Sequence, residues 1–166
     1  MKGALVFFVF FYFSLLLEST WCILCSIYFL HIDPIPSLIC WLALTEDIKK
    51  GMLTVIFAGF LASTFSSIHF FLFPVSYLIA FLTVYFVRSN LLELTKWQAY
   101  LVTGFISVEI LVMQLAGSGS PELLWPWGLF QSGLNIAIAP LVFWLCDKFY
   151  SLLNELHTRF AHEKRA

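Results

Sequence analysis

The segment that decides the fold reads PIPSLICWLAL and occupies residues 34–44. It is apolar, but two prolines stand at its start, and it is shorter than the roughly 20 residues that a helix needs to span a bilayer. Whether this segment crosses determines how many spans the chain has and which loops share one side of the membrane. The sequence on either side of it answers the question.

The composition of the whole chain indicates a membrane protein. Of the 166 residues, 61% are hydrophobic, 19% are aromatic and only 11% are charged, and the mean hydropathy is +0.91. Soluble domains carry about 25% charged residues, and a soluble protein of this size cannot hide so many apolar side chains. We therefore exclude a soluble enzyme, a nucleic-acid-binding domain and a disordered chain, and we predict an all-α, polytopic membrane protein.

Longer apolar runs lie on both sides of the short segment. The first, residues 3–30, contains a single charge, Glu18, and continues far beyond the length of a signal peptide. We predict that it is one retained transmembrane helix. The remaining candidate spans are residues 51–68, a run from residue 70 or 75 to 87, 97–115 and 128–145, with polar or proline-containing loops between them.

The positions of the basic residues set the orientation of these spans. Short cytoplasmic loops collect Lys and Arg. If residues 34–44 cross and the N-terminus is cytoplasmic, all nine basic residues fall on the cytoplasmic side: Lys2, Lys49, Lys50, Arg88, Lys96, Lys148, Arg159, Lys164 and Arg165. Without that crossing, Lys2 and Lys49 lie on opposite sides. We predict six transmembrane helices with both termini cytoplasmic, and a re-entrant pair of half-helices in this region is the alternative.

The end of the chain is predicted to form a cytoplasmic amphipathic helix. Its apolar residues recur at three- and four-residue steps, among them Phe149, Leu153, Leu156 and Phe160, and charged residues lie on the other face. We divide the chain into a six-helix transmembrane domain, residues 1–148, and this tail, residues 149–166. The tail either lies on the membrane surface or binds a cytoplasmic partner, and its mixed charge favours a protein contact.

Two carboxylates lie inside the apolar runs, Glu18 and Glu109. An ionisable side chain in hydrocarbon is costly and is a candidate functional residue. Each must face the bundle, find a partner or be protonated. We expect hydrogen bonds to Ser, Asn or Gln on neighbouring helices, with Gln114, Gln131 and Asn135 as candidate partners. A role in transport or proton relay is the alternative.

The sequence contains no set of residues that is typical of catalysis. Cys22 and Cys25 form a CxxC motif like that of disulfide-forming membrane oxidoreductases, but that chemistry needs a second outward-facing pair. Cys40 and Cys146 cannot supply it. No histidine and carboxylate cluster has convincing metal-ligand spacing, and no phosphate-binding loop is present. We therefore expect no catalytic residue, no metal ion and no cofactor.

The most specific pattern lies in the last span. Asn135 is followed five residues later by Pro140, then by Phe143 and by a basic end at Lys148. An Asn in lipid needs a hydrogen-bond partner and so favours a helix–helix contact, and a proline frees a backbone carbonyl. The pattern resembles the final helix of the rod-shape-determining protein MreD family.

Other features of the chain are similar to that family. They are the proline-led start of the second span, residues 36–39, and the glycine-led third span, from Gly51 through Gly59. One departure is Ser63, which stands where many members carry an Asp, so any role that depends on that Asp is in doubt.

The resemblance implies a non-catalytic subunit of the cell-elongation machinery in the bacterial inner membrane, which serves peptidoglycan synthesis. It implies an MreC-like bitopic membrane protein as partner and, through it, MreB-like filaments and peptidoglycan synthases. The family's helical layout is also similar to that of the substrate-binding membrane subunits of vitamin transporters. A small-molecule-binding transporter subunit is therefore the alternative function.

Overall fold

The computed structural model describes residues 2–25, 33–65, 71–90, 95–118 and 127–163. Within these ranges the chain is all-helical, and no strand occurs. The elements are α1 (Lys2–Cys25), α2 (Ile35–Thr45), α3 (Ile48–Thr64), α4 (Leu72–Asn90), α5 (Lys96–Ser118) and α6 (Trp127–Glu163). The predicted all-α class is confirmed, and each expected apolar run corresponds to one helix.

Local chemistry explains why α2 is short. At its start, the Asp33 carboxylate accepts a hydrogen bond from the backbone N–H of Ile35 (2.9 Å), and Pro36 occupies the first turn, where a missing N–H costs nothing. At its end, Glu46 adopts an extended backbone while its N–H still bonds the carbonyl of Leu42 (2.9 Å). The chain then turns at once into α3.

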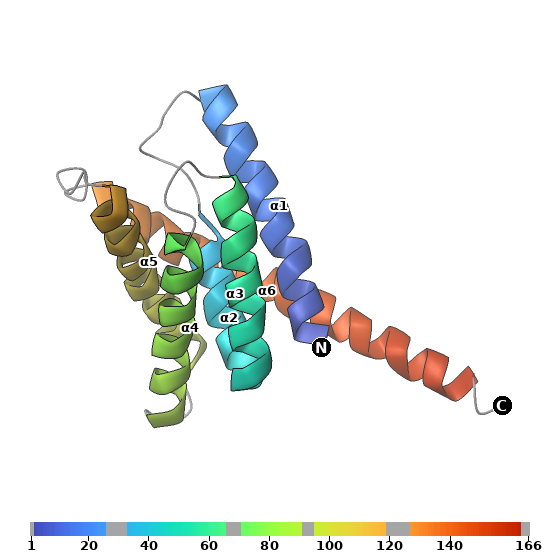
Figure 1. The fold of residues 1–166 in the computed structure, drawn as a ribbon. Coiled ribbons are helices and arrows are strands. Elements are labelled where there is room, and N and C mark those ends of the chain that lie inside the picture. The colour runs from blue at the N-terminus through green and yellow to red at the C-terminus, as the bar shows by residue number, and fades with distance from the viewer. Residues whose placement is uncertain (1, 26–32, 66–70, 91–94, 119–126, 164–166) are drawn as a thin grey trace.

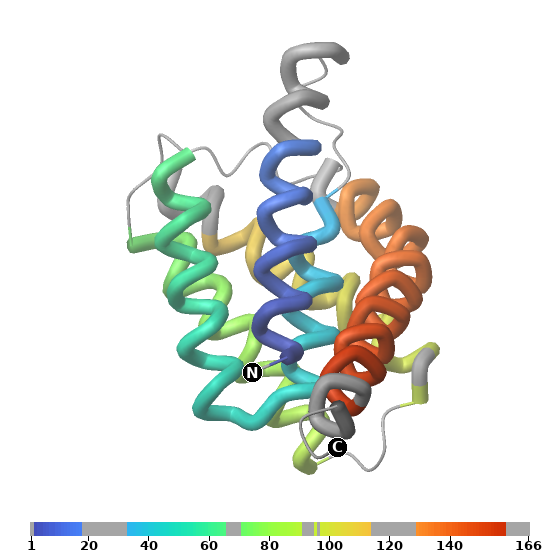
Figure 2. Tube along the Cα trace, turned by 90° about the vertical axis from the view of Figure 1, so that its right-hand side faces the viewer, coloured from blue at the N-terminus to red at the C-terminus, as the bar shows by residue number. Residues whose placement is uncertain are grey.

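Helix α2 lies at the centre of the bundle. It contacts each of the other five helices, and its residues from Ile35 to Ala43 are all buried. Figures 1 and 2 show α1, α3, α4, α5 and α6 arranged around it. Successive helices run in opposite directions, so the start of α1 and the end of α2 lie at the same end of the molecule (Figure 1).

Small residues bring α3 and α4 close together. A Cβ atom added at Gly59 would lie within 3.0 Å of the backbone of Pro74, and one added at Gly51 would meet the ring of Phe81. The glycines of the third span therefore serve helix packing.

The surface of the bundle is apolar, and its mainly hydrophobic core also contains polar side chains. Large hydrophobic side chains are exposed on all five outer helices, for example Tyr12, Phe57, Phe86, Phe105 and Leu141. The buried polar residues are Ser14, Ser37, Thr54, Ser63, Ser76, Thr103, Ser107, Gln131, Ser132 and Asn135. Soluble proteins rarely expose large contiguous apolar patches, so the surface is what distinguishes this bundle from a soluble one.

Two of the described helical segments are long and apolar enough to cross a membrane, namely Leu72–Asn90 and Leu129–Thr158. The apolar segments Lys2–Leu17, Ile35–Thr45 and Trp97–Met113 are shorter. Length and composition of these helices therefore indicate a membrane protein, whereas the number of spans, six, remains a prediction.

Candidate functional site

Asn135 joins three helices at one end of α2. Its side chain is fully buried on α6. The amide nitrogen donates to the Ser107 hydroxyl of α5 (2.5 Å), and the amide oxygen accepts from the backbone N–H of Asp33 (3.2 Å). Because Asp33 in turn caps α2, this one amide holds α5, α6 and the start of α2 together.

Of the other two residues of the last-span pattern, Phe143 lies at a helix contact and Pro140 lies inside α6. Pro140 stands inside α6 without ending it, and its missing N–H leaves the carbonyl of Ile136 without a helical partner. Ile136 itself packs where Gly104 of α5 leaves room. Phe143 is 7% exposed and sets its ring edge-on to Tyr100 of α5 (5.4 Å between centroids).

The opposite end of α2 is held by side chains from α4 and α6. The Arg88 guanidinium donates to the carbonyl of Ala43 (2.9 Å), and a cation is favourable at a helix C-terminus. The indole N–H of Trp41 donates to the Asp147 carboxylate of α6 (2.9 Å), and its ring meets Tyr150 edge-on. Asn135 and Asp147 thus place α6 against both ends of α2.

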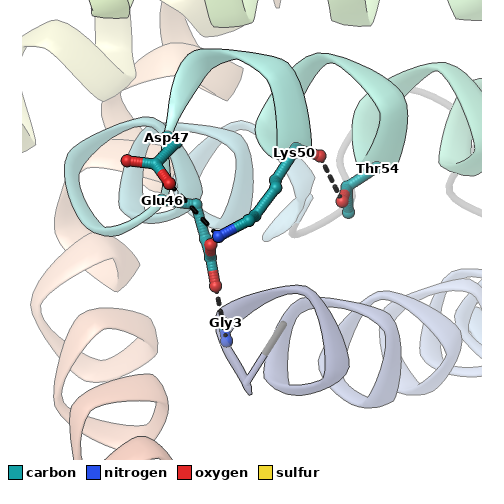
Figure 3. A network of polar contacts seen from close by, with 5 residues as sticks. All are labelled: Gly3, Glu46, Asp47, Lys50 and Thr54. Carbon is teal, nitrogen blue, oxygen red and sulfur yellow. Dashed lines mark hydrogen bonds and ion pairs between the residues drawn. The ribbon is translucent and has the colours of Figure 1, made fainter.

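The first turn of α1 closes the same end. Figure 3 shows the Glu46 carboxylate accepting a hydrogen bond from the backbone N–H of Gly3 (2.9 Å). Beside it, Lys50 pairs with Asp47 (3.2 Å) at the start of α3. The Lys2 ammonium reaches the side chain of Asn154 on α6 (2.7 Å), so the N-terminus is tied both to the α2–α3 turn and to α6.

These contacts bring the described basic side chains to one end of the bundle. Lys2, Lys50 and Arg88 are placed there by the bonds above. Lys49 precedes Lys50 in α3, and Lys148 follows Asp147 in α6. We call this the basic end. The positions of these residues in the sequence predict that they lie on one side of the membrane, and the fold brings them to one end of the bundle.

Glu109 has one bonded and one unbonded carboxylate oxygen. Its Oε1 accepts from the Thr83 hydroxyl of α4 (3.2 Å), whereas its Oε2 is buried without a hydrogen-bond partner. Asn135, a predicted partner, bonds Ser107 and Asp33 instead. The sequence does not single out Thr83, because several polar residues on neighbouring spans are chemically suitable. The Glu18 and Gln114 side chains lie outside the described residues.

An apolar groove of about 300 Å³ lies between α1, α2 and α6. Its one hydroxyl, that of Ser14, donates to the carbonyl of Phe10 within α1 (2.7 Å). The other lining residues are Phe10, Phe13, Leu17, Pro34, Leu38, Ile138, Leu141, Val142 and Leu145. The groove therefore suits a hydrocarbon chain or an apolar helix better than a polar solute.

Helix α6 continues beyond the basic end (Figure 1), with no break at the predicted boundary between residues 148 and 149. Phe149 still touches the bundle, edge-on to Phe10 of α1 (5.8 Å), and Leu153 is partly buried against the core. By contrast, Leu152 and Leu156 are 55% and 42% exposed. We call the exposed side chains of Phe149, Leu152 and Leu156 the tail stripe. The Phe160 side chain lies outside the described residues.

Cysteines and other candidate ligands form no site in the described part of the chain. Cys40 and Cys146 are buried free thiols, and no group of three or more His, Cys, Asp or Glu residues is placed to hold a metal ion among the side chains that the structure describes. The predicted CxxC pair, Cys22 and Cys25, lies outside those side chains.

Comparisons of the chain with protein-family models, with curated proteins and with solved structures find no match.

Proposed function

We propose that the chain is a six-span, non-catalytic subunit of a bacterial cell-elongation complex in the inner membrane, similar in role to MreD proteins, and that it binds an MreC-like single-span partner. The observation that carries the proposal is the tail stripe. It is apolar and exposed, and it lies on the part of α6 that follows Asp147 at the basic end.

The apolar surface of the bundle supports its place in a bilayer. Apolar side chains on every outer helix suit contact with lipid, and buried hydroxyls such as Thr54, Ser63 and Thr103 donate to carbonyls of their own helices. Internal satisfaction of polar groups is what a hydrocarbon environment demands. Helix α2 is too short to span unaided, but protein surrounds it, so its length need not match the bilayer.

The basic end supports the orientation. Cytoplasmic ends of membrane helices collect Lys and Arg, and Lys2, Lys49, Lys50, Arg88 and Lys148 gather at one end. With that end cytoplasmic, the tail stripe projects beyond the membrane on the cytoplasmic side.

The tail stripe supports a protein partner. Apolar side chains beyond the basic end meet water unless a partner or the membrane surface covers them. The hydrogen bond from Lys2 to Asn154 and the ring contact between Trp41 and Tyr150 hold the base of the tail against the bundle. Figure 1 shows the rest of α6 pointing away from the bundle. The mixed charge on the other face of the tail favours a protein contact over the membrane surface.

A small-molecule-binding transporter subunit is the second candidate, and the unbonded oxygen of Glu109 favours it. Ligand sites combine an apolar lining with several convergent polar groups. The groove between α1, α2 and α6 lacks such groups, and the groove beside Glu109 contains only Glu109 and Thr83 as polar residues. This lining supports the scaffold proposal over the transporter.

Reporter fusions test the topology. A reporter that is active only in the cytoplasm, fused after Asn90 or after Ala166, should be active in both cases, and one fused after Ser118 should be inactive. Activity after Asn90 without activity after Ala166 would contradict the six-span arrangement.

Affinity purification from a mild detergent tests the function. The wild-type chain should recover a single-span protein together with cell-wall synthases. The double variant Leu152→Asp, Leu156→Asp should recover at least tenfold less, whereas the matched control Glu155→Ala, Thr158→Ala should recover the wild-type amount. Rod-shaped cells should become round when the protein is depleted. Depleted cells that keep their rod shape would contradict the proposal. A small ligand that co-purifies with the Leu152→Asp, Leu156→Asp variant would also contradict it.

A further inference from the structure

The Glu109 carboxylate is chemically incomplete within the chain. It lies well inside α5, thirteen residues after Lys96 and nine before Ser118. The Thr83 hydroxyl satisfies Oε1 (3.2 Å), and Oε2 is buried with no partner. A buried polar atom without a hydrogen bond is costly, and in a membrane no bulk water is at hand to supply one.

This carboxylate lines an open groove of about 510 Å³ between α4 and α5. We call it the Glu109 groove. Its other lining residues are Thr83, Phe105, Val108, Val112 and Met113. Phe105 and Val112 are exposed, at 65% and 43%, so the groove opens on the outer face of the bundle. Thr83 already donates to Oε1, and no other lining side chain has a donor.

We propose that the Glu109 groove receives a transmembrane helix of another polypeptide, and that this helix brings a hydrogen-bond donor to the Glu109 carboxylate. The proposal rests on the proposed function, in that the chain spans a membrane. It is independent of the tail stripe, which lies on α6.

The chemistry of the groove favours a helix over the other occupants. A lipid acyl chain fits the apolar lining but has no donor, and lipid headgroups lie at the interface and not beside the middle of a span. A transmembrane helix satisfies its own backbone and presents Ser, Thr, Asn, Gln or basic side chains to its neighbours. A second copy packed symmetrically would set Glu109 near its own equivalent, where two ionised carboxylates would repel each other.

Photo-crosslinking in native membranes tests the proposal. A benzophenone amino acid replaces Val112 in the full chain. We expect an adduct whose crosslinked peptide comes from a transmembrane segment with a donor side chain at the contact. The same amino acid at Leu101, which is 64% exposed on α5 but outside the groove, should give no such adduct.

Variants of Glu109 test the role of the carboxylate. Glu109→Leu should reduce the adduct at least tenfold, whereas Glu109→Gln should keep at least half of it, because its amide oxygen still accepts. If Glu109→Leu does not accumulate in the membrane, Val112→Trp fills the groove and leaves the Thr83 bond intact. With the crosslinker at Met113, that variant should abolish the adduct, and Leu101→Trp should not.

Three outcomes would overturn the proposal: adducts with lipid alone, adducts only with a second copy of the chain, or an adduct that Glu109→Leu and Val112→Trp leave unchanged. A chain that is embedded in the membrane and still captures its partner through the tail stripe can nevertheless give no adduct. That result would overturn the proposal for the Glu109 groove and leave the proposed function standing. If the chain captures no partner through the tail stripe but the adduct in the Glu109 groove persists, the proposed function is overturned and the groove proposal stands.

Discussion

Helices α2 and α6 are the shortest and the longest elements of the described chain, at 11 and 37 residues. Nearly all of α2 is buried, whereas α6 exposes large apolar side chains along much of its length, from Leu129 to Leu156. The contrast shows that the length and composition of a central helix are set by the helices packed around it. Those of an outer helix are set by the solvent or lipid that it contacts.

Side-chain hydrogen bonds also connect α6 to both ends of the α2 segment. Asn135 holds the start of α2 and Asp147 holds Trp41 near its end. Twelve residues of α6, about 18 Å of helix, separate these two bonding residues. This distance matches the length of α2, so α6 acts as a brace along the central helix and then continues out of the bundle.

The largest effect is expected from removing the biggest side chain of the central helix. Trp41→Ala should lower the free energy of unfolding by about 3–5 kcal/mol, because it leaves a cavity in a packed core and an unpaired Asp147. The measurement is unfolding in mixed micelles with increasing SDS. The matched control is Trp144→Ala on α6, which is 56% exposed and should cost under about 1 kcal/mol. Equal costs would break the contrast between the two helices.

A smaller effect is expected at the bond between the two helices. Asn135→Leu should lower the free energy of unfolding by about 1–3 kcal/mol, because the buried hydroxyl of Ser107 and the N–H of Asp33 lose their partner. A double-mutant cycle with Ser107→Ala isolates the side-chain pair and should show a coupling of about 0.5–1.5 kcal/mol. Strict additivity would show that this amide does not join α5 to α6.

At the basic end, a cation that bonds the end of α2 can be compared with a cation that does not. Arg88→Met should cost about 1 kcal/mol, because the carbonyl of Ala43 loses a cationic donor at the C-terminus of α2. Lys49→Met, an exposed cation on α3, should stay within about 0.5 kcal/mol of wild type. Equal stability of the two variants in the same unfolding assay would show that Arg88 does not hold the end of α2.

The smallest effect on stability is expected where α6 has left the bundle. Leu152→Ser with Leu156→Ser should change the free energy of unfolding of the purified chain by less than about 0.5 kcal/mol, because both side chains are exposed. The comparison is with Leu42→Ser, a fully buried position of α2, which should be strongly destabilising. A large loss at Leu152 and Leu156 would show that the tail belongs to the core.

The helices were predictable because apolar runs and their breaks have local causes. Pro34 and Pro36 mark the start of α2, and the polar residues from Glu46 mark its end. The partner of Glu109 was not predictable, because several polar residues on neighbouring spans are chemically suitable and only the rotation of α4 against α5 selects Thr83. For the same reason, the bond from Asn135 to the backbone of Asp33, 102 positions away, has no local signal.

The amino-acid sequence by itself determined the helical class, the membrane character of the chain and the grouping of its basic residues, because these depend on composition and on the alternation of apolar runs with charged breaks. Only the tertiary structure decided that the shortest run is the centre of the bundle, that α6 braces it at both ends and that Glu109 retains an unbonded oxygen. Such facts depend on which face each helix turns toward its neighbours, and that choice is made by packing among all the helices together.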